Sequence, residues 1–141
     1  RMFGFQAAGA APLVLGHDVE NPETVATAIR IGKPASGSKA LAARDDSNGL
    51  ISSVTDEQIL DAQAFLAAKE GIFVEPASAA GVAGLLALKQ SGDLPAGQRI
   101  VITVTGNGLK DIDTALSRTE LSTEAVEPST DRVAALLGLH Q

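Results

Sequence analysis

The feature that most constrains the fold is the segment from Arg99 to Asp111, which reads RIVITVTGNGLKD. Its first part, Ile100 to Val104, is an uninterrupted β-branched run without glycine or proline. Such a run predicts a strand buried on both faces, as in a parallel sheet covered by helices. Gly106 and Gly108 then give the backbone freedom for a sharp turn or a close approach to a ligand. Thr105 therefore places a hydroxyl at the end of a buried strand, where open α/β sheets bind ligands.

Composition and charge restrict the class of protein. The chain has 141 residues, which is one domain at most and enough for a real core. Only 3% of the residues are aromatic, so the core must depend on aliphatic contacts. The net charge of -6 offers no basic surface for nucleic acid, and no apolar run reaches the roughly 18 residues of a membrane span. The absence of cysteine excludes disulfides and thiolate metal sites and fits a cytoplasmic protein, and no second histidine near His17 suggests a metal site.

A strand followed by a helix is predicted between residues 50 and 71. Leu50 to Val54 has the length and residue types of a short strand. Thr55 and Gln58 form a capping box, in which each side chain can bond to the backbone of the other. An apolar face follows at helical spacing, made of Ile59, Leu60, Ala62, Leu66 and Ala67. Gln63 interrupts that face, and Gly71 ends the helix.

A second helix start with unusual composition follows a short apolar strand at residues 72–74. Glu75 precedes Pro76, which is well suited to the first position of a helix. The small residues 77–81 let this helix approach another surface closely. That surface is either a neighbouring backbone or a ligand, and the residues alone leave both possibilities open.

The remaining patterns are shorter. They predict a strand or turn before Pro12 with a helix after it, either a short helix or a packed loop at 24–31, and helices at 38–44, 112–116 and 131–137. Residues 118–130 are polar and are expected to form a surface connection.

Four motifs in register carry a resemblance to a known family. They are GFQA-x-GAAP at residues 4–12, ATAIRIG-x-P at 26–34, EPASAA at 75–80, and the segment 99–111. In this order and spacing they resemble the threonine synthases, enzymes that use pyridoxal phosphate (PLP) and have the tryptophan-synthase-like fold, fold type II. The resemblance extends to about Leu116. Ser78 and the motif at 26–34 are closer to threonine synthase than to the related dehydratases, which tend to carry glycine at the position of Ser78.

The resemblance implies an α/β fold in which a parallel-sheet segment with flanking helices forms part of a fold type II enzyme. Residues 1–141 would be the C-terminal portion of the PLP-dependent catalytic domain, with 117–141 as a surface connection and C-terminal helix. The Schiff-base lysine, the cofactor-contacting asparagine and the phosphate loop belong to the family's earlier sequence. We therefore expect no catalytic residue in this chain, and we expect the chain to be inactive without the remainder of the enzyme.

The resemblance also assigns cofactor and substrate contacts. It implies that the hydroxyl of Thr105 faces the pyridine nitrogen of PLP, that Gly106 lets the backbone pass close to the ring, and that Glu75 lies near the cofactor. Ala28 and Ile29 would lie on the substrate side. A neutral hydroxyl stabilises the ring nitrogen without fully protonating it, which suits elimination and replacement chemistry better than transamination.

For the complete enzyme, the resemblance implies a lyase that converts O-phosphohomoserine and water to threonine and phosphate, in a homodimer. Three alternatives remain at this point. The chain could belong to another fold type II enzyme, such as a serine/threonine dehydratase. It could be an independent α/β module that binds an anion or phosphate at residues 106–108 and the following helix start. It could also be a structural piece without a ligand.

Overall fold

A computed structural model describes residues 1–118 and 125–139 of the chain. Strands β1 (Phe3–Ala7) and β2 (Leu50–Val54) form a parallel sheet in the register Phe3↔Leu50 to Ala7↔Val54. The connection between them carries η1 (Ala8–Ala10), α1 (Pro12–Leu15), η2 (Thr27–Ile29) and α2 (Gly37–Asp46). The predicted α/β class with a parallel sheet is thus confirmed, and so are the strand at 50–54 and the helix after Pro12.

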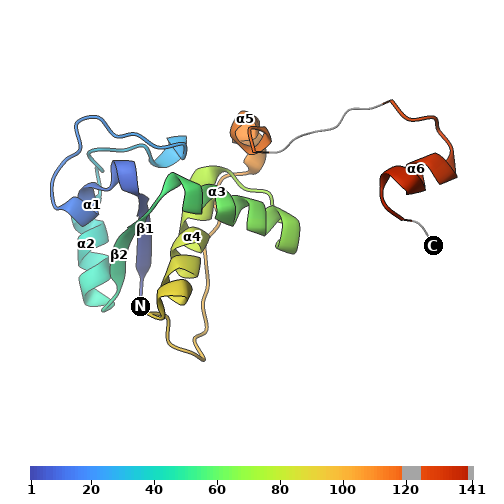
Figure 1. The fold of residues 1–141 in the computed structure, drawn as a ribbon. Coiled ribbons are helices and arrows are strands. Elements are labelled where there is room, and N and C mark those ends of the chain that lie inside the picture. The colour runs from blue at the N-terminus through green and yellow to red at the C-terminus, as the bar shows by residue number, and fades with distance from the viewer. Residues whose placement is uncertain (119–124, 140–141) are drawn as a thin grey trace.

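One of two long helices covers one side of this sheet, and the other packs against that helix (Figure 1). α3 (Asp56–Phe65) continues through one wider turn, η3 (Leu66–Glu70), and ends at Gly71 with a left-handed φ of 66°. The predicted capping box is present: Gln58 N–H donates to Thr55 Oγ1 (3.2 Å), and Thr55 N–H donates to Gln58 Oε1 (2.9 Å). α4 (Pro76–Ser91) packs against α3 and both strands, with Pro76 in its first turn as predicted.

The core lies between the sheet, α3 and α4, and it is aliphatic. Its buried members include Ala7, Val54, Ile59, Ala62, Leu66, Val74, Ala79, Ala80, Val82 and Ala83. α4 lies very close to β1, where a Cβ atom on Gly84 would lie 2.2 Å from Cδ1 of Phe5. Only glycine at that position allows the helix to sit so near the strand.

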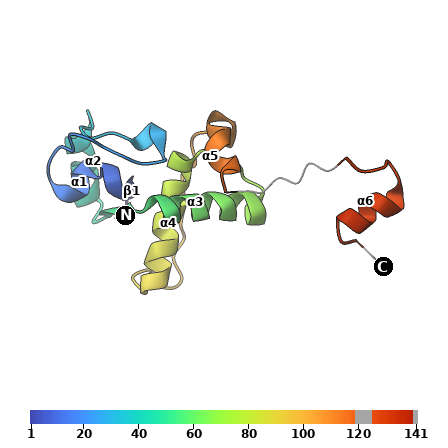
Figure 2. The same ribbon diagram turned by 45° about the horizontal axis from the view of Figure 1, so that its top comes forward.

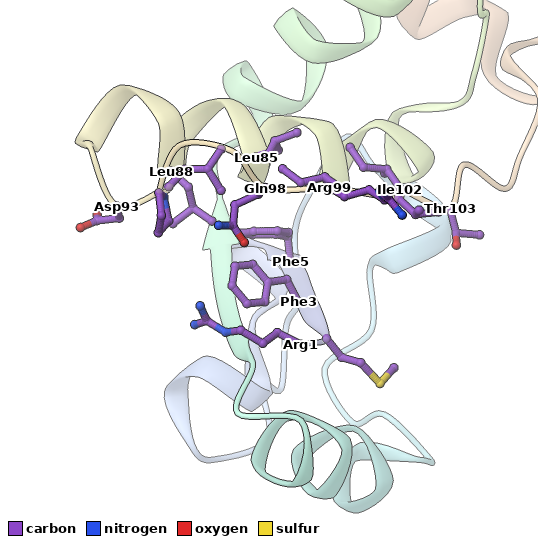
Figure 3. A pocket seen from close by; sticks show the side chains of 16 residues that line it. Arg1, Phe3, Phe5, Leu85, Leu88, Asp93, Gln98, Arg99, Ile102 and Thr103 are labelled. Atoms are coloured by element: carbon purple, nitrogen blue, oxygen red, sulfur yellow. The ribbon is translucent and has the colours of Figure 1, made fainter.

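The expectation of a strand at Ile100–Val104 is wrong for this structure. The segment is extended but forms no ladder, and Val101 is 89% exposed. Only Ile102 packs against the core. The physical reason is the lack of a neighbouring strand, because a cavity of about 510 Å³ separates this segment from β1. Figure 3 shows Phe3 and Phe5 on one side of that cavity and Arg99, Ile102 and Thr103 on the other.

The other expected elements either have bounds close to the predicted ones or are shorter than predicted. Residues 72–74 form an isolated antiparallel bridge, Val74 with Asn107, in place of a strand. The segment 24–31 is a packed loop with the single 3-10 turn η2. Beyond the bridge come η4 (Gly108–Asp111), α5 (Ile112–Leu116) and α6 (Thr130–Leu136).

The C-terminal region is separate from the body of the molecule. Figures 1 and 2 both show α6 apart from the other helices. Ser129 caps it by accepting a hydrogen bond from Arg132 N–H at 3.3 Å, close to the predicted helix start at 131. Part of the expected surface connection, residues 119–124, lies outside the described residues. In the part that is described, no helix combines the length and apolar character that a membrane crossing requires.

Candidate functional site

Residues 105–108 lie directly against the start of α4. Glu75 N–H donates to the Gly106 carbonyl at 3.0 Å, and Gly108 N–H donates to the Phe73 carbonyl at 3.1 Å. These two bonds flank the Val74–Asn107 bridge. Two motifs that are about 30 positions apart in the sequence therefore form one corner.

Thr105 is held by its backbone while its side chain stays exposed. Its N–H donates to Ser78 Oγ at 2.7 Å, and Ser78 is 5% exposed. The hydroxyl of Thr105 has no hydrogen-bond partner among residues 1–118 and 125–139. The site thus presents a neutral donor that is fixed in place and not occupied by a neighbouring group.

Gly106 is buried and lies against the carboxylate of Glu75. A Cβ atom at position 106 would lie 1.9 Å from Glu75 Oε1, so a larger residue would displace that carboxylate. A second carboxylate follows at Asp111, whose Oδ1 accepts from Thr114 N–H at 3.4 Å. Its Oδ2 is buried and has no partner among the described residues.

The substrate-side candidates Ala28 and Ile29 lie on η2, which is anchored to the first turn of α3. The carboxylate of Asp56 accepts from the Thr24 hydroxyl and from Val25 N–H, the latter at 2.9 Å. Ile29 packs against the core, and Ala28 is exposed. η2 contacts α4, and both η2 and the start of α4 lie beyond the carboxyl ends of the two strands (Figure 1). The predicted residues therefore gather at the sheet end where α/β folds bind ligands.

Three supporting residues were not predicted from the sequence as parts of the site. Asp56 anchors the η2 loop, Ser78 holds Thr105, and Gln63 donates from Nε2 to the Val74 carbonyl at 2.8 Å. Gln63 is 5% exposed. Its interruption of an apolar helix face was the available signal, because a buried amide must find a partner.

All five lysines of the chain are exposed: Lys33, Lys39, Lys69, Lys89 and Lys110. Asp18 accepts a hydrogen bond from Lys33 in a 2.8 Å ion pair, which raises the pKa of that lysine. A nucleophilic lysine needs the opposite shift, produced by burial or by a neighbouring cation.

Comparison with known proteins decides the family. A family model described as pyridoxal-phosphate dependent enzyme matches residues 1–106. The chain belongs to this family. Its relatives include threonine synthases from Synechocystis sp. (52% identical over 139 residues, 98% of this chain and 36% of that protein) and Mycobacterium leprae (59% over 116 residues, 82% and 32%). The chain thus spans about a third of the length of these relatives.

Solved structures support the same fold. A threonine deaminase from T.th. aligns over 70% of this chain and 40% of its own, with a TM-score of 0.53 and 22% identity. A fungal L-serine ammonia-lyase from Rhizomucor miehei aligns over 82% of this chain and 40% of its own, with a TM-score of 0.57 and 20% identity. At these identities the likeness concerns the fold, which agrees with the fold type II architecture expected from the sequence.

Proposed function

We propose that this chain forms the C-terminal portion of a threonine synthase and one wall of its PLP site. The observation that carries the proposal is the corner at Thr105, where a neutral hydroxyl is fixed by its backbone, exposed and unpaired among the described residues. Sequence identity of 47–59% to threonine synthases over most of the chain supports the choice of reaction. The reaction is the conversion of O-phosphohomoserine and water to threonine and phosphate.

The residues of the corner fit the cofactor. PLP, when bound, supplies an electron sink for the substrate carbons. The hydroxyl of Thr105 would donate to the ring nitrogen without transferring a full charge. Gly106 would keep the backbone close to the ring, with the Glu75 carboxylate beside it, and Ala28 with Ile29 would form the substrate side. This chain's work would be to bind and orient, while proton transfer would fall to groups outside it.

We place the Schiff-base lysine in the remainder of the enzyme. The exposure of all five lysines supports this assignment, and so does the greater length of the relatives. The cavity beside β1 supports it too. One edge of β1 pairs with β2, its other edge pairs with no strand of the described residues, and its Phe3 and Phe5 line the cavity. Residues 99–104 run in the same direction on the far side (Figure 1). A further parallel strand of the complete enzyme, placed between them, would satisfy both edges.

The same proposal includes a cytoplasmic homodimer, for which the resemblance is the support. Other functions have weaker support. A dehydratase agrees with the two structural neighbours, but their identity is 20–22%. An anion-binding module is disfavoured, because the Glu75 carboxylate lies on Gly106 and the following helix, η4, has four residues.

The test uses the complete enzyme with Thr105→Val, Thr105→Ser and the control Thr130→Val on α6. Release of phosphate from O-phosphohomoserine and the pH dependence of the absorbance of bound PLP are measured. Loss of a hydrogen bond of about 1.5 kcal/mol should lower kcat about tenfold in Thr105→Val. Thr105→Ser and Thr130→Val should stay close to the parent. Unchanged kcat and unchanged absorbance in Thr105→Val would overturn the proposal, and release of ammonia from serine or threonine without release of phosphate from O-phosphohomoserine would favour the dehydratase.

A further inference from the structure

We infer that Ser78 is a positioning residue for Thr105: its buried hydroxyl fixes the direction in which Thr105 presents its own hydroxyl. The geometric part of this inference stands on the structure, and its consequence for the reaction rests on the proposed function.

Thr105 is held in a different way from the residues that follow it. Backbone groups of Phe73 and Glu75 hold Gly108 and Gly106. Past Glu75 the chain enters α4 through a proline, which has no N–H to donate. At Thr105 the contact is instead made by a side chain, Ser78 Oγ, at 2.7 Å.

The Ser78 side chain is itself rigidly held. Ser78 is 5% exposed and lies in the first turn of a 16-residue helix, where its N–H donates to the Glu75 carbonyl at 3.0 Å. Its neighbour Ala79 is fully buried. A serine hydroxyl offers one donor and two acceptor positions, so it can hold the Thr105 N–H and still donate elsewhere. A short hydrogen bond from a buried, helix-borne acceptor restrains the peptide group in front of Thr105.

Two hydrogen bonds together restrain the backbone around Thr105. Ser78 fixes the peptide N–H of Thr105, and the Glu75 N–H fixes the carbonyl of Gly106. Thr105 is therefore clamped on both sides, and the direction of its Cα–Cβ bond follows from the backbone on either side. Upstream, the one packing contact of residues 99–104 with the core is that of Ile102, since Val104 and Val101 are exposed and the segment forms no ladder in the described structure. Loss of the Ser78 hydroxyl should therefore loosen the backbone at Thr105 first.

The test uses the complete enzyme with Ser78→Ala, Ser78→Cys and the control Ser91→Ala at the other end of α4. Exchange of individual backbone amides is followed by NMR in the cofactor-free protein. The Thr105 amide should exchange at least about tenfold faster in Ser78→Ala, the value expected for losing roughly 1.4 kcal/mol of protection. The Gly108 amide, bonded to Phe73, should not change. Ser78→Cys keeps the size with a weaker acceptor and should be intermediate, so it provides a result even where the alanine variant fails to fold.

The kinetic consequence is read on the same variants. Ser78→Ala should lower kcat with little change in KM, and it should change the pH dependence of the absorbance of bound PLP in the same sense as Thr105→Val. Ser91→Ala should do neither. Unchanged exchange at Thr105 overturns the inference, and so does faster exchange with parental kcat. A parental kcat in Thr105→Val counts against the proposed function instead, and it leaves the exchange result for Ser78 standing.

Discussion

Two five-residue segments of this chain have the sequence of a strand, and only one of them is a strand. Leu50–Val54 pairs with β1 along its whole length, and its last residue, Val54, is 2% exposed. Ile100–Val104 is the more β-branched of the two, yet Val101 is 89% exposed. A helical segment follows each of them, α3 in the first case and η4 with α5 in the second. The difference between them is therefore the presence of a neighbour.

A strand-like sequence shows that its side chains favour burial. It does not show that a neighbouring segment is present to pair with its backbone. Backbone N–H and C=O groups need partners from another chain segment, which the local residues cannot provide. Exposed apolar side chains beside a cavity indicate a surface that is covered by further polypeptide. This is why we assign the cavity next to residues 99–103 to a strand of the complete enzyme.

The largest expected effect is a difference in unfolding free energy between alanine variants of Val54 and Val101. Val54→Ala removes two methyl groups from a buried position and should lower the free energy of unfolding by about 2 kcal/mol. Val101→Ala removes the same atoms from an exposed position and should change it by less than about 0.5 kcal/mol. Urea unfolding of the 141-residue chain measures both values.

The complete enzyme provides the decisive second measurement for these valines. If a strand fills the cavity there, Val101→Ala should become destabilising, approaching the effect of Val54→Ala. A small change in unfolding free energy for Val101→Ala in both proteins would contradict the proposed strand. A loss of unfolding free energy for Val101→Ala in the isolated chain as large as that for Val54→Ala would contradict the fold described for residues 99–104.

The next effect concerns how α4 meets β1, the strand partner of Leu50–Val54, and how it meets Ile100–Val104. A Cβ atom at Gly84 would lie 2.2 Å from the Phe5 ring, while one at Gly81 would lie 3.3 Å from Cγ2 of Ile102. Gly84→Ala should therefore destabilise by about 1–2 kcal/mol, because overpacking exceeds the gain in helix propensity. Gly81→Ala should be close to neutral or slightly stabilising, since Ile102 belongs to the loosely held segment. Thermal unfolding of both variants tests this, and equal losses would show that residues 99–104 are held as firmly as β1.

Much of the fold was predictable because its signals are local. The capping box at Thr55, the helix start at Pro76 and the strand at 50–54 each depend on residues a few positions apart. The prediction of a strand at 100–104 was wrong because strand pairing depends on a partner segment that no local pattern contains. Residues 72–74 form a bridge and not a strand for a similar reason, since the segment that pairs with them is the turn at Asn107.

The sequence motifs named residues of the candidate site and did not name the residues that hold them in place. The motifs named Thr105, Gly106 and Glu75, and the structure brings these three together. The motifs did not give Ser78 or Gln63 a role, because each acts on the backbone of a distant segment. A buried polar side chain in a small-residue or apolar helix face was the only sign of either.

The smallest expected effect compares the caps that follow the two segments. Thr55 caps the 10-residue α3 through both bonds of its capping box, whereas Asn107 caps the four-residue η4 through one bond to Leu109 N–H at 2.9 Å. Thr55→Ala should cost about 1 kcal/mol of unfolding free energy, because α3 unfolds with the core. Asn107→Ala should cost no more than a few tenths, about 0.3 kcal/mol, because an exposed terminal turn can open locally before the core does. Hydrogen exchange separates the two cases: Thr55→Ala should speed exchange throughout α3, while Asn107→Ala should affect only the amides next to it. A loss at Asn107 equal to that at Thr55 would mean that the second segment unfolds together with the core, despite its lack of a partner strand.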